Sequence, residues 1–254
     1  MISFMLDSNV WEKAICPDDY PDGEDYRELN KKIMSATGVE FYLSATIFDL
    51  EDIRRKDRLV ELKAYNPSFK TEIKQDGDII NMRFTIGPSS FPYKQNPKLS
   101  KHAMMAFNTG FKVVASSRVG IPINPLREQS TIDLTNEQNE KISEVSEFIE
   151  QLGSGMASLN SVLTKYGIKK GNLLSMIKAL PQDAIKPFSD AVSEWADGDT
   201  VAACIGMDID YLVTNDMAGK AGSKSIFYKD NIQKLISKYP QFKIITPSDM
   251  LSLL

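Results

Sequence analysis

The residues of this chain best suited to chemistry are aspartates that follow apolar, strand-like runs. Asp7 comes directly after the apolar run 2–6. Asp216 comes two residues after the run 211–214. Since ligands of an open parallel sheet bind beyond the carboxyl ends of its strands, we expect both acids at one edge of such a sheet. Carboxylates gathered there suit Mg²⁺ or Mn²⁺, hard cations that prefer oxygen ligands and activate a water for hydrolysis.

A third acid, Asp199, is predicted to begin a helix. The first turns of this helix carry the small residues Ala202 and Ala203, which permit close packing against a sheet. Asp197 is a near competitor for the same role. The chain has 34 aspartates and glutamates, and a single acid at a strand end is more often a turn or cap residue. The joint occurrence of these acids is therefore what indicates metal chemistry.

Counts of histidine and cysteine exclude several other chemistries. The chain has one histidine, His102, so a site built from several histidines is excluded. A Ser-His-Asp triad would need His102, and nothing near it resembles a nucleophile elbow. Cys16 and Cys204 stand in unrelated contexts and show no metal or redox spacing, so we expect two free thiols in a reducing cytoplasm. The chemistry must then rest on carboxylates, hydroxyls or lysines.

Composition is typical of a globular protein that does not enter a membrane. The longest apolar runs are a few residues, far below the roughly 20 that a membrane helix needs, and the N-terminus does not read as a signal peptide. The net charge of −4 argues against a protein that coats nucleic acid non-specifically. A nuclease remains compatible with this charge, because an acidic site lowers it while a local basic patch binds phosphate. The expected location is cytoplasmic.

Strands that alternate with helices at both ends of the chain predict how the acids are positioned. Strands are predicted over residues 2–6, 39–43, 111–115, 211–214 and 242–245. Helices are predicted over residues 10–15, 26–36, 45–56, 99–108, 136–152, 157–166, 172–180, 184–195, 199–206, 231–239 and from 247 onward. This order favours an α/β fold with a parallel sheet covered on both faces. Two strand-like runs around Asp76-Gly77 predict a β-hairpin over about 69–86.

Three sequence motifs in a fixed order resemble the PIN-domain family. The chain begins with a strand that ends at Asp7, carries an Asp-x-x-x-Ala helix at Asp199 and Ala203, and follows with the strand-end motif Thr214-Asn215-Asp216. The likeness covers residues 1–15, 38–58 and 195–254. It implies a three-layer α/β/α fold with a central parallel sheet. The whole of 1–254 would be one PIN-like domain, enlarged over 59–195 by an insertion that holds the hairpin and the helices of about 136–195.

The family also places an acid on the helix that follows its second strand. Three candidates occur there: Asp49, Glu51 and Asp52. With Leu50 at the centre of the buried face of an α-helix, Glu51 falls between Ile47 and Phe48 on the apolar side. Asp49 faces the other edge. Glu51 is therefore preferred, and Asp49 stays the alternative.

The resemblance implies a metal-dependent endoribonuclease that cleaves RNA with a metal-activated water. Asp7, Asp199 and Asp216 would hold Mg²⁺ or Mn²⁺, and Glu51 would bind through water or position the nucleophile. Four neighbouring polar residues would orient these ligands or serve only as turn and cap residues: Ser8, Asn9, Thr214 and Asn215.

Cations near the predicted site are candidates for contacts to RNA. The densest basic cluster follows Glu51 and contains Arg54, Arg55, Lys56 and Arg58. Alternatively, these cations only compensate the partial negative charge at the C-terminus of the predicted helix. Lys220 lies in the loop after Asp216 and is a further candidate.

Other functions compatible with the sequence differ in activity or in partner. A haloacid-dehalogenase-like phosphatase would need an aspartate where Asn9 stands, so this class is disfavoured. A silent nucleic-acid-binding module of the same fold and a toxin-type nuclease held by an inhibitory protein both remain open. Because related domains often pair, the resemblance also implies a homodimer, although no interface signature stands out.

Overall fold

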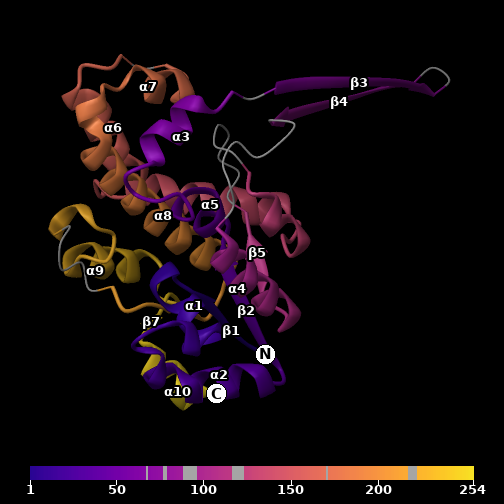
Figure 1. The fold of residues 1–254 in the computed structure, drawn as a ribbon, viewed down its shortest axis with the longest axis vertical. Coiled ribbons are helices and arrows are strands. Elements are labelled where there is room, and N and C mark those ends of the chain that lie inside the picture. Colours follow the sequence, from indigo (N-terminus) through magenta and orange to yellow (C-terminus); the bar gives the residue numbers. More distant parts are fainter. Residues whose placement is uncertain (67, 77–78, 88–95, 116–122, 170, 217–221) are drawn as a thin grey trace.

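A five-stranded, all-parallel sheet is the centre of the molecule (Figure 1). The computed structural model describes residues 1–254 except 67, 77–78, 88–95, 116–122, 170 and 217–221. The strand order is β5-β2-β1-β6-β7. The strands are β1 (Ile2–Leu6), β2 (Val39–Ser44), β5 (Lys112–Val114), β6 (Tyr211–Val213) and β7 (Ile244–Ile245). Because all five run the same way, their carboxyl ends meet at one edge.

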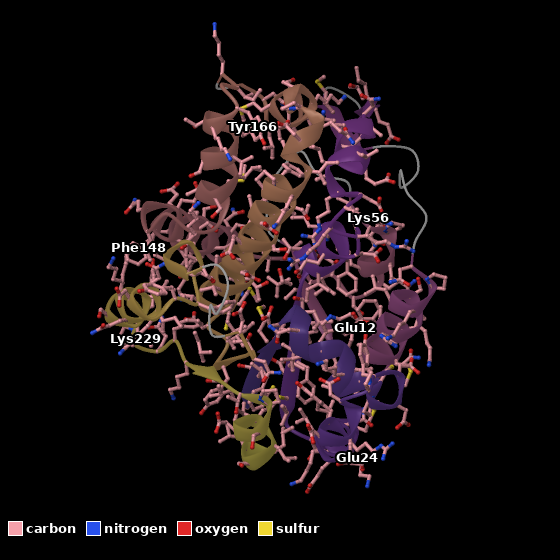
Figure 2. The ribbon with its side chains drawn as sticks, turned by 60° about the vertical axis from the view of Figure 1, so that its left-hand side comes forward. Glu12, Glu24, Lys56, Phe148, Tyr166 and Lys229 are labelled. Carbon is pink, nitrogen blue, oxygen red and sulfur yellow. The ribbon has the colours of Figure 1, made fainter. Side chains whose placement is uncertain are left out.

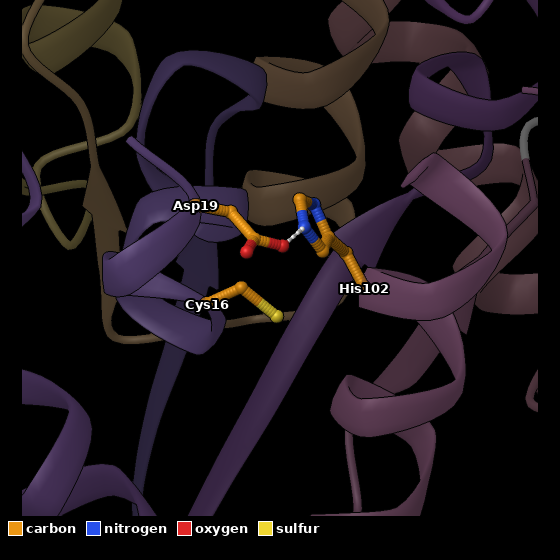
Figure 3. Close-up of side chains that lie close together, drawn as sticks. All are labelled: Cys16, Asp19 and His102. Carbon is orange, nitrogen blue, oxygen red and sulfur yellow. Dashed lines mark hydrogen bonds and ion pairs between the residues drawn. The ribbon is translucent and has the colours of Figure 1, made fainter. Parts of the chain in front are cut away.

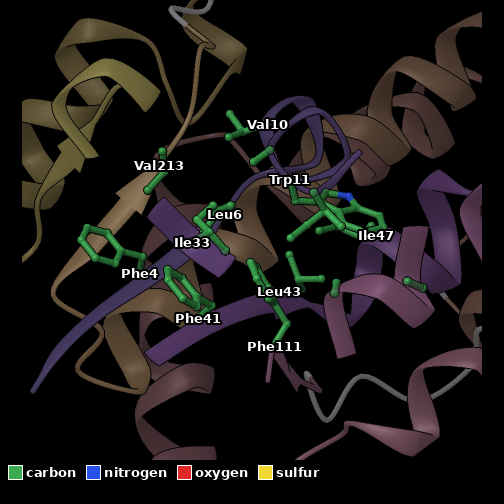
Figure 4. Close-up of a cluster of buried hydrophobic side chains, with 14 of the residues drawn as sticks. Phe4, Leu6, Val10, Trp11, Ile33, Phe41, Leu43, Ile47, Phe111 and Val213 are labelled. Carbon is green, nitrogen blue, oxygen red and sulfur yellow. The ribbon is translucent and has the colours of Figure 1, made fainter. Parts of the chain in front are cut away.

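Alternation along the strands builds a separate core on each face of the sheet. Phe4 and Leu6 of β1 point to one face and Met5 to the other. Figure 4 shows the first core, in which Phe4 and Leu6 pack with Trp11 and Ile33 of the covering helices. Four helices supply that layer: α1 (Ser8–Ile15), α2 (Arg27–Ser35), α4 (Pro97–Asn108) and α10 (Pro247–Leu253).

The opposite face is covered by a second helical layer. Met5 and Leu212 of the sheet pack there against Val145 and Leu235. The helices of this layer are α5 (Asn136–Gln151), α8 (Ile185–Gly206) and α9 (Lys229–Lys238). The predicted three-layer α/β/α fold is thereby confirmed.

A third core extends the molecule beyond the sheet. Leu59, Leu163 and Phe188 are among its buried members, and Leu50 joins it from the segment after β2. Its helices are the first half of α8 together with α3 (Arg58–Ala64), α6 (Met156–Lys165) and α7 (Leu173–Ala179). In Figure 1 these helices gather at one end of the molecule, away from α2 and α10.

A β-hairpin projects from the region of α3 (Figure 1). β3 (Ser68–Asp76) pairs antiparallel with β4 (Ile79–Gly87) as a separate two-stranded sheet. The predicted hairpin over 69–86 is confirmed, and its turn residues 77–78 lie outside the described residues. Short 3₁₀ segments complete the fold: η1 (Pro17–Asp19), η2 (Gly23–Tyr26), η4 (Pro125–Gln129), η5 (Gln182–Ala184) and η6 (Gly222–Lys224).

The helix α8 is one 22-residue element, whereas two helices were predicted over 184–195 and 199–206. Gly198 does not interrupt it. A Cβ atom at Gly198 would lie 2.8 Å from the Cα atom of Gly155, at the start of α6. The glycine therefore permits a close approach of two backbones. Asp197 and Asp199 consequently lie inside a helix, and Asp199 does not begin one.

The segment after β2 also differs from the prediction of a helix over 45–56. Its regular part is a π-helical turn, η3 (Ile47–Glu51), in which the Asp52 amide donates to the Ile47 carbonyl over 3.1 Å. The α3 helix that follows was not predicted. Within the described ranges, no helix combines the length and apolarity needed to span a bilayer.

Candidate functional site

Asp7 lies at the carboxyl end of β1 and caps the N-terminus of α1. Its Oδ1 accepts a hydrogen bond of 2.7 Å from the Ser8 amide. Its Oδ2 accepts from the Thr214 hydroxyl over 2.6 Å and from the Asn9 amide group over 2.7 Å. Burial raises the pKa of Asp7, and the charge of Asp216 raises it further. The hydrogen bonds from Thr214, Ser8 and Asn9 lower it. The carboxylate is thus held in one orientation at 2% exposure.

Asp216 lies just after the neighbouring strand β6, and hydrogen bonds tie this strand end to α1. The Asp216 amide donates to the Thr214 hydroxyl oxygen over 2.9 Å. The Asn215 amide donates to the side-chain oxygen of Asn9 over 3.1 Å, and Asn9 also donates to the Thr214 oxygen over 3.2 Å. Ser8, Asn9 and Thr214 therefore contact the acids or their backbone, as a role in orienting them requires.

Glu51, at the end of η3, belongs to the same group of acids. The Ser8 hydroxyl donates to its Oε1 over 3.3 Å. Burial and the charge of Asp7 raise the pKa of Glu51 to about 7, against the opposing influence of Arg58. Both carboxylates thus share one weakly solvated region at the edge of the sheet.

Asp49, the alternative helix acid, is occupied elsewhere. It accepts from Arg127 Nε over 2.9 Å and from the Asn124 amide over 2.8 Å. This buried ion pair anchors the 3₁₀ turn η4. The structure therefore brings Glu51 to Asp7 and directs Asp49 to Arg127.

The helix α8 contributes Asp197 and Glu194 to the group. These residues are three apart, so they lie on one side of the helix. Burial is the largest cause that raises the pKa of Asp197 well above its ordinary value. The charges of Asp7, Glu51, Glu194 and Asp216 raise it further. Burial and the charge of Asp216 likewise raise the pKa of Glu194, which accepts a hydrogen bond from Ser225. Asp197 is thus the acid that interacts with all the others, and we call these five residues the acidic cluster.

The motif assigned the metal-ligand role on this helix to Asp199, which lies on a different side of α8 from Asp197. Two residues along a helix correspond to a rotation of about 200°, so Asp199 points away from the side that carries Asp197. It lies four residues after Trp195, on the side of α8 that this tryptophan shares, and is 2% exposed. Asp197, which the sequence offered as a competitor for this role, lies near the other acids of the cluster. Glu194 was missed, although its three-residue spacing from Asp197 in a continuous helix would have indicated it.

The acidic cluster offers only oxygen donors, which fits Mg²⁺ or Mn²⁺. Four carboxylates raise the pKa of Asp197, so a cation between them would relieve their repulsion. Among the residues that the structure describes, no three of these carboxylates form a group with ligand atoms all within 4.8 Å of one another. This spacing fits an ion such as Mg²⁺, which keeps several of its waters. Asp7, Asp197 and Asp216 are the residues that would hold it.

The predicted RNA-binding cations differ in their exposure. Arg54, Arg55 and Lys56 are exposed beside Glu51, and Lys56 can be located in Figure 2. Arg58 is 4% exposed, which contradicts a surface role. Its Nε donates to the Ile53 carbonyl over 3.0 Å, and its Nη1 donates to the Ser189 carbonyl and to the Ser193 hydroxyl. Arg58 instead links the segment that follows η3 to α8, and the charge of Glu51 acts on its guanidinium group. Lys220 lies outside the described residues.

Comparisons with known proteins add no family assignment. No protein-family model and no curated protein matches this chain.

Proposed function

We propose that this protein is a metal-dependent endoribonuclease of the PIN type, whose acidic cluster holds Mg²⁺ or Mn²⁺ through Asp7, Asp197 and Asp216. One observation carries the proposal: at the carboxyl edge of a parallel sheet, carboxylates that follow β1 and β6 or lie on η3 and α8 are close enough for their charges to act on Asp197. A stable fold rarely gathers buried like charges without a counter-ion. The resemblance in residue order to PIN domains supports RNA as the substrate.

The chain's own residues hold the reacting groups in place. The bound ion would supply an activated water and stabilise negative charge on the phosphate. Hydrogen bonds from Ser8, Asn9 and Thr214 keep the Asp7 carboxylate from rotating. Ser8 also donates to Glu51, so one residue sets the spacing between Asp7 and Glu51. Glu51 then orients water on the side of the cluster that faces Arg55 and Arg58.

Exposed cations beside the acidic cluster give RNA a docking surface. Arg54, Arg55 and Lys56 follow directly after η3, which carries Glu51. Arg55 is 69% exposed and lies 3.8 Å from Asp190, a weak surface pair that a phosphate can replace. RNA phosphates bound here would enter next to the carboxylates, and this contact would weaken as the salt concentration rises.

The test is RNA cleavage by purified protein with Mn²⁺ or Mg²⁺. We expect the wild type to cleave single-stranded or structured RNA, chelation of the metal to stop cleavage, and Asp7→Asn to reduce the rate on the order of 100-fold or more. Glu28→Gln serves as the control, since Glu28 is an exposed acid of α2 outside the cluster. Equal cleavage by wild type and Asp7→Asn would disprove the mechanism. Binding of Mn²⁺ and RNA without cleavage would instead favour the silent module or a nuclease restrained by a partner protein.

A further inference from the structure

A second group of possible metal ligands lies away from the acidic cluster, where the end of α1 meets α4. It contains the Cys16 thiol, the Asp19 carboxylate and the His102 imidazole (Figure 3). Their ligand atoms all lie within 4.8 Å of one another. His102 is fully buried and Cys16 is 6% exposed, so nitrogen and sulfur donors meet inside the protein. The proposed nuclease activity uses none of these residues.

The orientation of His102 is set by an acid on its far side. Its Nδ1 lies 2.5 Å from Glu12 Oε2, an oxygen that also accepts from the Tyr20 hydroxyl over 2.6 Å. A carboxylate on one imidazole nitrogen holds the ring and leaves the other nitrogen as the ligand atom, as around many metal-binding histidines. Here the other nitrogen, Nε2, points to Asp19, 2.8 Å from its Oδ2.

A neighbouring cation competes for the same carboxylate. Lys101 Nζ lies 2.7 Å from Asp19 Oδ2. The ammonium group of Lys98 also lies nearby, and it donates to the Asp19 backbone carbonyl over 3.2 Å. A metal ion must displace Lys101 or use the second oxygen of Asp19. The rival interpretation is a protonated His102 held between Glu12 and Asp19 by two ion pairs.

We propose that Cys16, Asp19 and His102 bind Zn²⁺ through Sγ, a carboxylate oxygen and Nε2, with water as the fourth ligand. Mixed sulfur, nitrogen and oxygen donors suit this borderline-soft cation, whereas the oxygen-only acidic cluster suits Mg²⁺ or Mn²⁺. The site joins the segment after α1 to α4, which are distant in sequence, so the ion acts as a staple between them. Binding releases the thiol proton of Cys16 to solvent.

Cobalt serves as the probe, because Co²⁺ bound to a thiolate absorbs by charge transfer and Zn²⁺ is spectroscopically silent. Full-length protein freed of metal by a chelator is titrated with Co²⁺, and Zn²⁺ is then added. We expect one equivalent of the charge-transfer species, displaced by Zn²⁺. Cys16→Ser should abolish this absorption, whereas Cys204→Ser, which alters the buried cysteine of α8, should keep it. Absence of the band in the wild type, or its persistence in Cys16→Ser, would overturn the proposal.

Two further variants separate metal binding from loss of structure. Glu12→Gln should weaken Zn²⁺ binding by about 10–100-fold, because it removes the acid that orients His102. Lys101→Met should strengthen binding several-fold, because it removes the competing cation, and a misfolded protein cannot show such a gain. If Lys101→Met weakens or does not change Zn²⁺ binding, the ion-paired histidine is the correct interpretation.

Discussion

Two aspartates on α8 show how strongly side-chain direction decides the role of an acid. Asp197 and Asp199 are separated by one residue; Asp197 is half-buried and Asp199 is buried. Burial and then the charges of Asp7, Glu51, Glu194 and Asp216 raise the pKa of Asp197. The rotation of about 200° between the two aspartates places Asp199 on the Trp195 side of the helix. The proposal therefore takes Asp197, and not the Asp199 of the motif, as the metal ligand on this helix.

The paired variants Asp197→Asn and Asp199→Asn test this assignment. Asparagine keeps the size of aspartate and removes its charge, so we expect Asp197→Asn to lower RNA cleavage and Mn²⁺ affinity on the order of 100-fold. Asp199→Asn should cleave at close to the wild-type rate. Single-turnover cleavage and calorimetric Mn²⁺ titration provide the measurements, with circular dichroism to check folding. A large loss in Asp199→Asn alone would return the metal-ligand role to that residue.

At the scale of elements, α8 joins the helical core to the acidic cluster. Its first half packs with α3, α6 and α7, and its second half covers the sheet. Gly198 is the point at which α8 meets the backbone at the start of α6. The position of Asp197, one residue earlier, therefore depends on a contact between two glycines, Gly198 and Gly155.

Gly198→Ala should destabilise the protein, although alanine is normally the better helix residue. The added Cβ would lie 2.8 Å from Gly155 Cα, where a backbone atom must move. We expect a loss of about 1–3 kcal/mol in the free energy of unfolding, measured by urea denaturation. Ser161→Ala is the matched control: it is an exposed site on α6 and should change stability by less than about 0.5 kcal/mol. A stabilised Gly198→Ala variant would contradict the close approach.

For the whole molecule, the acidic cluster couples folding to pH and to metal. Carboxyls from three segments, the end of β1, η3 and α8, have pKa values above their ordinary ones, including Asp7, Glu51 and Asp197. Between the unfolded and the folded pKa, the folded protein binds more protons than the unfolded chain. The free energy of unfolding of the metal-free protein must therefore fall as the pH rises through this interval.

With respect to these groups, we expect the metal-free protein to be most stable below about pH 4 and to lose stability progressively as the pH rises from there through about 7. Glu51, whose pKa rises from 4.5 to about 7, accounts for a loss on the order of 2–3 kcal/mol. Saturating Mn²⁺ should restore stability at neutral pH, because it binds the folded state only. Urea denaturation across this range measures both effects. A stability that rises with pH without metal would refute the mutual repulsion, and Asp197→Asn should flatten the profile.

Local patterns were sufficient for most elements and for part of the site. A short apolar run predicted β1, and the acid that follows it, Asp7, lies at the carboxyl edge. The Asp-Gly signal predicted the β3–β4 hairpin. Glu51 was selected on the geometry of an α-helix, and it does lie beside Asp7, although the backbone there is a π-helical turn. These features depend on neighbours in the chain, so the order of residue types determines them.

Contacts between residues distant in the chain decided the rest. Whether Gly198 ends a helix or permits close packing depends on Gly155, which no local pattern reveals. The sequence predicted an exposed Arg58, whereas its guanidinium group is buried against α8 and donates to the Ser189 carbonyl. The sequence alone thus determined the strands, the hairpin and the presence of acids at strand ends. The tertiary structure alone decided which acids meet and which cations are exposed, because those outcomes depend on the packing of α8 against η3 and α6.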